Sequence, residues 1–143
     1  MFSNILIAYD DSTEARKALA TGIQLASELH SKVYLATVQE PDPGYYALAA
    51  YVEPNLPATI HSEKAAVLRD LQNAAKKKAA ESGVDLETIL IDGKEVDGIL
   101  QALKSTHSDL LVLGLHRHNN GLEWAGTVRK LTNQCNCSVL AAQ

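Results

Sequence analysis

The sequence predicts an α/β fold in which a five-stranded parallel sheet carries helices on both faces. Short apolar segments alternate along the chain with longer segments whose apolar residues recur at helical spacing. Such alternation favours a parallel sheet, because right-handed crossovers leave few other arrangements. The segment 110–113 is wholly apolar, as expected of a strand buried on both faces. The length of 143 residues suits one domain, so we expect residues 1–143 to fold as a single unit.

The first half of the chain begins with two strand-like segments and a helix between them. Apolar, β-type residues at 5–9 and at 33–38 predict the first and second strands. Between them, apolar residues recur at helical spacing from 15 to 29. Ser12 or Thr13 has the side chain that an N-cap requires, so we expect this helix to begin there.

Residues 41–59 interrupt the alternation with several prolines and with Tyr45, Tyr46 and Tyr51. A structureless loop of this length is unusual inside a compact domain. The segment is therefore either functional or an excursion with a short helix of its own. Two interpretations stay open: a surface cover packed by its tyrosines, or a lid or partner surface.

The alternation resumes after this interruption. A helix is expected to end before Gly83, a residue type that commonly terminates helices. The Asp92-Gly93 pair predicts a turn, and His107 is placed in the last turn of the helix that follows. The expected elements are a helix at 60–82, a strand at 84–91, a helix from 96, a strand at 110–114, a helix that begins near 126 and a strand at 138–142.

Composition disfavours two classes of partner. The formal charge is −4, and no basic stripe is present beyond the run at 76–78, which we interpret as a solvated helix face, so no nucleic acid is expected. No apolar run approaches the roughly 20 residues that span a bilayer, so no membrane is expected. The first residues lack the basic, apolar and small-residue pattern of a secretion signal, which favours a cytoplasmic location.

The two cysteines predict neither a disulfide nor a metal site. Cys135 and Cys137 are too close in sequence for a good disulfide and supply half of a zinc site. His116 and His118 would complete four ligands, but we expect reduced thiols and no metal. No carboxylate or nucleophile is spaced to orient these histidines, so we interpret them as solvated loop residues.

Polar features follow two strands that are expected to be neighbours. Asp10 ends the first strand, and Gly114 opens a loop that closes on Gly126-Thr127 at the head of a helix. If the sheet winds outward in both directions from its first strand, these strand ends meet at the topological switch point, where open α/β sheets bind ligands. A Thr preceded by Gly at a helix start offers N–H groups and a hydroxyl to an anion. Asp10 either contacts a ligand, through a ribose hydroxyl or an adenine amino group, or Asp10 or Asp11 caps the first helix.

Other sites of α/β proteins are excluded by their motifs. No P-loop, no Gly-x-Gly-x-x-Gly after the first strand and no Gly-x-Ser-x-Gly elbow occurs. A phospho-receiver domain would need a lysine after the last strand, and no lysine follows Lys130. No catalytic residue is therefore expected.

The chain closely resembles the universal stress proteins over nearly its whole length. The resemblance rests on the segments 5–10 and 108–116 and on Gly126-Thr127 leading to 137–140. It implies a Rossmann-like, adenine nucleotide alpha hydrolase-like three-layer sandwich. It also implies a homodimer, commonly formed through the last strands. Many members bind ATP through a Gly-x-x-Gly-x₉-Gly-Ser/Thr loop, with an Asp after the first strand contacting the nucleotide.

Residue by residue, the match to this nucleotide site is partial. Asp10 matches the nucleotide Asp and Val38 the apolar position after the second strand, while Gly114 and Gly126-Thr127 match the two ends of the loop. Arg117 stands where the second glycine belongs, and the loop from there to Gly126 is one residue short. In addition, Arg129 replaces the small hydroxyl residue expected two positions after Thr127.

The arginine changes what the loop can do. A glycine allows positive φ and close approach of the backbone to phosphate, which an arginine can match only at a cost of roughly 1 kcal/mol or more. Arg117 could instead neutralise phosphate charge through its side chain, and Gly121 could supply the missing flexibility. The altered pattern more closely resembles the family branch that does not bind ATP.

Three functional hypotheses follow. The first is a cytoplasmic, non-catalytic dimer that acts in the stress response as a signalling or interaction module, with an unknown protein partner and with ATP binding weakened or absent. The alternative is an adenine-nucleotide sensor that uses Arg117 and Gly121, with slow hydrolysis or autophosphorylation. The third is a small-molecule or metal-binding protein that uses the His and Cys pairs.

Overall fold

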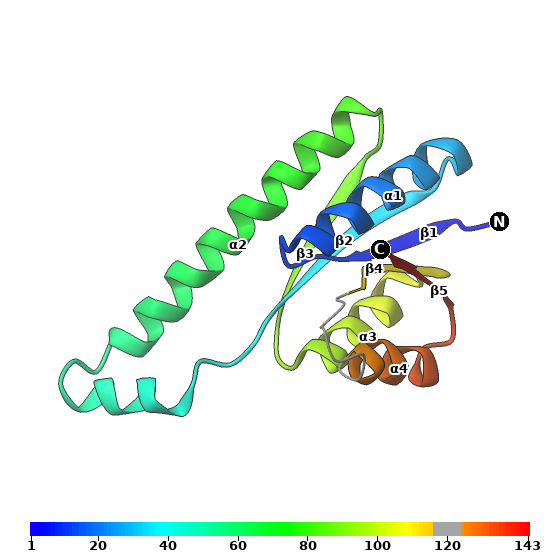
Figure 1. The fold of residues 1–143 in the computed structure, drawn as a ribbon. Coiled ribbons are helices and arrows are strands. Elements are labelled where there is room, and N and C mark those ends of the chain that lie inside the picture. The colour runs from blue at the N-terminus through cyan, green and yellow to red at the C-terminus, as the bar shows by residue number, and fades with distance from the viewer. Residues whose placement is uncertain (116–123) are drawn as a thin grey trace.

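The computed structural model describes residues 1–115 and 124–143 (Figure 1). Strands and helices alternate, with one additional short helix after the second strand. In chain order the elements are β1 (Asn4–Ala8), α1 (Thr13–Leu29), β2 (Lys32–Gln39), the 3₁₀ helix η1 (Gly44–Tyr51), α2 (Leu56–Glu81), β3 (Leu86–Asp92), α3 (Glu95–Thr106), β4 (Leu110–Gly114), α4 (Trp124–Gln134) and β5 (Ser138–Ala142).

All described strands belong to one parallel sheet of order β3-β2-β1-β4-β5. The central strand is β1, whose Ile5 pairs with Val33 of β2 on one side and with Leu110 of β4 on the other. The Asp109 carboxylate accepts hydrogen bonds from the backbone N–H groups of Ser3 and Asn4, at 2.8 and 3.0 Å, and so joins the starts of β1 and β4. The chain therefore winds outward from β1 in both directions, which confirms the predicted sheet.

Helices cover both faces of the sheet (Figure 1). Helices α1 and α2 pack on one face and α3 and α4 on the other, and each pair encloses a hydrophobic cluster. The strand β1 serves both clusters, because Ile5 and Ile7 point to the first and Leu6 to the second. All three side chains are fully buried. The predicted three-layer sandwich is confirmed.

Helix ends follow local chemistry. The Ser12 hydroxyl oxygen accepts a hydrogen bond from Ala15 N at 3.1 Å, so Ser12 is the N-cap of α1. At the C-terminal end of α3, His107 has a left-handed backbone with φ of 50°. It caps the helix there, whereas the sequence placed it in the last helical turn. Gly83, with φ of 70°, follows the end of α2 as predicted.

Helix α2 starts earlier than the sequence indicated. It begins at Leu56 instead of residue 60, and Pro57 lies in its first turn. Proline is well accommodated there, because the N–H that it lacks would have no partner inside the helix. The proline therefore helps to start the helix, whereas the sequence pattern assigned it to a loop.

Of the two alternatives for 41–59, the excursion with a short helix of its own is present as η1, but this helix does not cover the body of the protein. Together with the first part of α2 it projects away from the sheet (Figure 1). Lys64 Nζ holds it to α2, donating to Asp42 Oδ1 at 2.6 Å and lying 5.0 Å from the centre of the Tyr46 ring. Tyr45 and Tyr51 remain 63% and 89% exposed, so the interpretation as a cover packed by its tyrosines is wrong. None of the described helices is long and apolar enough to cross a membrane.

Candidate functional site

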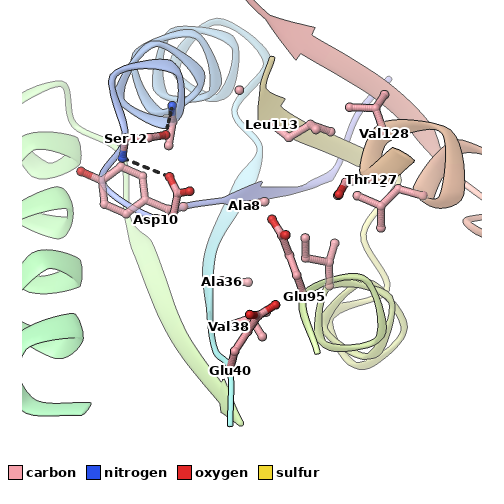
Figure 2. Close-up of a pocket in the computed structure, with 15 residues that line it drawn as sticks. Ala8, Asp10, Ser12, Ala36, Val38, Glu40, Glu95, Leu113, Thr127 and Val128 are labelled. Carbon is pink, nitrogen blue, oxygen red and sulfur yellow. Dashed lines mark hydrogen bonds between the residues drawn. The ribbon is translucent and has the colours of Figure 1, made fainter. Parts of the chain in front are cut away.

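A pocket of about 490 Å³ opens at the carboxyl ends of β1, β2 and β4 (Figure 2). It lies where the crossovers from β1 and β4 leave the sheet on opposite faces, which is the ligand position of open α/β sheets. Its volume is in the range of small-molecule sites. The apolar part of the wall includes Ala8, Ala15, Ala36, Val38, Ile99, Leu113, Val128 and Leu131. The polar rim includes Asp10, Ser12, Glu40, Glu95 and Thr127.

The structure brings together four of the residues selected from the sequence. Asp10, Val38, Gly114 and Thr127 all line this pocket, although they come from four separate parts of the chain. Gly126 lies beside Thr127 in α4. Arg117 and Gly121 lie outside the described residues, as do His116 and His118.

The turn after β1 places Asp10 at the pocket. Asp10 Oδ1 accepts a hydrogen bond from the backbone N–H of Ser12 at 3.0 Å. Ser12 in turn caps α1, so the capping role considered for Asp10 or Asp11 belongs to Ser12. Of the two roles that the sequence left open, the structure leaves Asp10 on the pocket rim (Figure 2).

Asp11, which is not among the residues lining the pocket, also fixes this turn. Its backbone is left-handed, with φ of 60°, a conformation that Asp tolerates better than most residues. Its carboxylate accepts hydrogen bonds from Tyr9 Oη at 2.9 Å and from Arg16 at 2.9 and 3.1 Å. The bonds from Arg16 and Tyr9 lower the pKa of Asp11. Burial, reinforced by Asp11, raises the pKa of Tyr9 to about 12.

Sequence reasoning missed this cluster. Its only local signal is an acidic residue followed, five positions later, by an arginine inside the helix. That spacing is not one of the helical pairs, since Asp11 lies before the helix begins. The left-handed turn is what brings Tyr9, Asp11 and Arg16 together.

The two glycines matched to the nucleotide loop have different surroundings. A Cβ at Gly114 would lie 2.4 Å from the carbonyl carbon of Glu14 and 2.7 Å from Ala15 N. Gly114 therefore allows the end of β4 to pack on the start of α1, which is a structural requirement. A Cβ at Gly126 would meet nothing within 4 Å. Packing within the described chain does not demand this glycine.

The residues predicted to offer N–H groups and a hydroxyl to an anion lie in the first turn of α4 instead of at its cap. The helix begins at Trp124, so Gly126 and Thr127 are its third and fourth residues. The Thr127 hydroxyl points toward the pocket (Figure 2). The N–H groups of a first helical turn still favour an anion. Arg129 is exposed on α4, and the pocket lining does not include it.

Two acidic residues on the rim were not found from the sequence. Glu40 directly follows β2, and Glu95 is the first residue of α3. Both line the pocket, and their carboxylates point into it (Figure 2). The available signal was their position, because each follows a strand of the parallel sheet at the same edge as Asp10. The residues of 1–115 and 124–143 that line the pocket include no lysine or arginine.

The cysteines form neither a disulfide nor, among the described residues, part of a metal cluster. Both are free, and Cys135 Sγ donates a weak hydrogen bond to the Cys137 carbonyl at 3.6 Å. Burial, together with the neighbouring Cys135, raises the pKa of Cys137 to about 11. Within the described part of the chain, no group of three or more His, Cys, Asp and Glu side chains is placed to hold a metal ion.

The volume and lining of the pocket are compatible with an adenine nucleotide. Its apolar wall can bury a planar base, and carboxylates such as Asp10 can accept hydrogen bonds from ribose hydroxyls. The first turn of α4 can receive a phosphate beside Thr127. A base, a sugar and one phosphate would therefore each have a partner.

Comparisons with known proteins agree with this arrangement. The model of the Universal stress protein family matches residues 1–143. Universal stress protein YxiE of Bacillus subtilis (strain 168) is 34% identical over 147 residues, covering 98% of this chain and 98% of its own. The solved universal stress protein UspA from Lactobacillus plantarum has a TM-score of 0.82 and 21% identity, covering 99% of this chain and 97% of its own.

A second solved structure adds a ligand. The universal stress protein from Archaeoglobus fulgidus, in complex with dAMP, has a TM-score of 0.68 and 18% identity, covering 99% of this chain and 98% of its own. At these identities the two solved structures support the fold alone. The family match and the Bacillus relative establish to which family the chain belongs. This chain belongs to the universal stress protein family.

Proposed function

We propose that this chain is a non-catalytic, cytoplasmic module of the stress response that binds an adenine nucleotide and holds ATP only weakly. The observation that carries the proposal is the meeting of Asp10, Val38, Gly114 and Thr127 around one pocket. These four are among the described positions that match the nucleotide site of the family, and Gly126 is the fifth. The dAMP complex of the Archaeoglobus protein supports a nucleotide of this size.

We expect weak binding of ATP because of the charge of the described residues on the pocket rim. Proteins that bind and cleave triphosphates surround the phosphates with lysine, arginine or metal ions. The described rim presents carboxylates and a threonine instead. Binding of the base and sugar would then signal the concentration of the nucleotide to a protein partner, and the nucleotide would not be hydrolysed. The sensor alternative, in which Arg117 and Gly121 hold the triphosphate, stays a prediction because both residues lie outside the described chain.

Assembly into a homodimer through the last strand is part of the same proposal. β5 lies at one edge of the sheet, with β4 on its inner side. An edge strand offers backbone N–H and C=O groups to a second copy. Sedimentation equilibrium tests this directly: a mass of two chains is expected, and a single chain at high micromolar concentration contradicts the dimer.

Calorimetry with AMP, ADP and ATP tests the nucleotide proposal. We expect AMP to bind measurably, and Asp10→Ala to weaken it by about tenfold, since the charged acceptor for the ribose is removed. Ser27→Ala, at the far end of α1, is the matched control and is expected to leave binding unchanged. Absence of binding by all three nucleotides would refute the proposal. ATP binding tighter than AMP, with slow release of phosphate, would favour the sensor alternative.

A further inference from the structure

A polar cluster joins the start of α2 to the ends of two strands. His61 of α2 lies between two carboxylates, with Nε2 3.2 Å from Asp92 Oδ1 and Nδ1 3.5 Å from Asp42 Oδ2. Asp92 is the last residue of β3, and Asp42 lies in the segment that leads from β2 to η1. Gln39, the last residue of β2, is buried and donates from Nε2 to the His61 carbonyl at 3.1 Å. The imidazole therefore lies where the projecting part of the chain meets the sheet (Figure 1).

His61 provides the polar attachment of this part of the chain. Within the described residues, the hydrogen bonds and ion pairs that link 56–64 of α2 to a strand all involve His61. Lys64 contacts Asp42 and the Tyr46 ring, so it holds η1 to α2 and not to the sheet. A change in the charge of His61 consequently acts on the attachment of η1 and the start of α2 to the sheet.

The neutral imidazole has a partner at both nitrogens. A neutral histidine has one donor nitrogen and one acceptor nitrogen. Gln39 Nε2 is a donor and lies 3.3 Å from Nδ1, so Nδ1 accepts and Nε2–H donates to Asp92. The bond from the same amide nitrogen to the His61 carbonyl fixes the orientation of Gln39. In this form the ring carries no charge, and Nδ1 has no proton to donate to Asp42.

A proton on Nδ1 changes these contacts in favour of attachment. The ring then loses the hydrogen bond from Gln39, which joins two neutral groups, and becomes a cation between carboxylates at 3.2 and 3.5 Å. Hydrogen bonds between ionised groups are roughly twice as strong as those between neutral groups. The gain therefore exceeds the loss, although solvent reduces it because the side chain of His61 is 37% exposed.

The surrounding charges allow this change in mildly acidic solution. Histidine is the side chain whose charge ordinarily changes between about pH 5 and about pH 8. The hydrogen bond from Lys64 lowers the pKa of Asp42, so Asp42 stays ionised in that range. The side chain of Asp92 is 71% exposed, and exposed carboxylates are ionised above about pH 5. Lys64 is the cation that faces the cluster, and Asp42 binds it through Oδ1 while presenting Oδ2 to His61.

We infer that His61 is a pH-sensitive attachment point that holds η1 and the start of α2 to the sheet more firmly when it is protonated. By linkage, the added attachment is present at acidic pH and is lost as pH rises through the titration of the histidine. The attachment positions the apolar surface of η1, where Tyr45 and Leu48 are 63% and 64% exposed. Mild acidification thus fixes that surface relative to the sheet. The inference does not depend on nucleotide binding.

Amide hydrogen exchange of the full chain, without nucleotide and at about pH 5.5 and about pH 7.5, tests the inference. Rates are expressed as protection factors, which remove the effect of pH on the exchange chemistry itself. A short helical segment that leaves the sheet is marginal in water, so detachment exposes the amides of 60–66. We expect their protection factors to be about threefold to tenfold higher at the acidic pH. The amides of 73–79, where Ala75 and Ala79 belong to the first hydrophobic cluster, should change by less than about twofold.

Three variants assign the response to the cluster. His61→Gln keeps a polar side chain that gains no charge, so the increase in protection at acidic pH should disappear. Asp92→Asn removes the carboxylate nearer to the ring and should reduce the increase to below about twofold. Asp70→Asn, an exposed carboxylate farther along α2, is the matched control and should keep the full increase.

Equal protection of 60–66 at the two pH values in the wild type overturns the inference, as does an increase that persists in His61→Gln. Loss of the response in Asp70→Asn also contradicts it, because any change of charge on α2 would then be sufficient. No nucleotide is present in this experiment. Failure here therefore leaves the proposed nucleotide binding unaffected, and absence of nucleotide binding leaves the role of His61 unaffected.

Discussion

Two regions differ in how their apolar residues are buried: the pocket edge and the projecting arm. The arm is defined as η1 with residues 56–64 of α2. At the pocket edge, the turn after β1 is held by hydrogen bonds from Tyr9, Ser12 and Arg16, and the end of β4 packs directly on α1. In the arm, Leu48 and Tyr51 are 64% and 89% exposed, although η1 contains no charged residue.

The difference shows what determines burial. An apolar segment is buried only when another element of the chain lies opposite to it, and the sheet supplies that element for β1 and β4. The arm extends beyond the sheet, so its apolar side chains have no such surface within the described chain (Figure 1). Substitutions at the pocket edge should therefore be costly, and those in the arm should not.

The largest effect on folding is expected from Gly114→Ala. The added methyl group would overlap the backbone of Glu14 and Ala15, which cannot move without shifting the start of α1. We expect the free energy of unfolding to fall by about 2–4 kcal/mol, measured by urea denaturation. Gly126→Ala is the control: its methyl group meets no atom of the described residues within 4 Å, and alanine is the better helix former, so no loss and a gain of up to about 1 kcal/mol is expected. Equal losses in both variants would contradict this account.

A smaller effect is expected from Asp11→Ala. Alanine loses the ion pair with Arg16 and tolerates the left-handed backbone less well, so about 1–2 kcal/mol of stability should be lost near neutral pH. Asp11→Asn keeps the backbone preference and should lose less.

The difference in unfolding free energy between wild type and Asp11→Asn should depend on pH with a definite sign. The folded pKa of Asp11 lies below its ordinary value of 3.8. Its contribution is therefore present above 3.8 and is lost as pH falls through the lowered folded pKa. The gap in unfolding free energy between wild type and Asp11→Asn should close in that acidic range. A gap that stays constant with pH would show that the charge of Asp11 does not stabilise the turn.

The smallest effect is expected in the arm. Tyr51→Ser removes a large ring that is 89% exposed, so the free energy of unfolding should change by less than about 0.5 kcal/mol. Thermal unfolding of dilute protein measures this. A loss comparable to that of Gly114→Ala would mean that Tyr51 is buried in solution and that the two regions do not differ as described.

The sequence predicted what depends on pattern. The alternation of elements, the winding of the sheet from β1 and the meeting of Asp10 with Gly114 all followed from periodicity and connection rules. It did not predict what depends on three-dimensional neighbours. Gly114 looked like a ligand-contacting glycine, but its closest constraint is the backbone of α1. Glu40 and Glu95 looked like ordinary surface residues until the sheet placed them on one rim.

The most direct test of the central claim, that the switch point of the sheet is a nucleotide site, is a titration of isotope-labelled protein with AMP followed by NMR. The account predicts that amide signals of Asp10, Val38, Gly114 and Thr127 shift together and saturate along one binding curve. Shifts confined to the opposite end of the sheet, around Val33 and Val84, would contradict it.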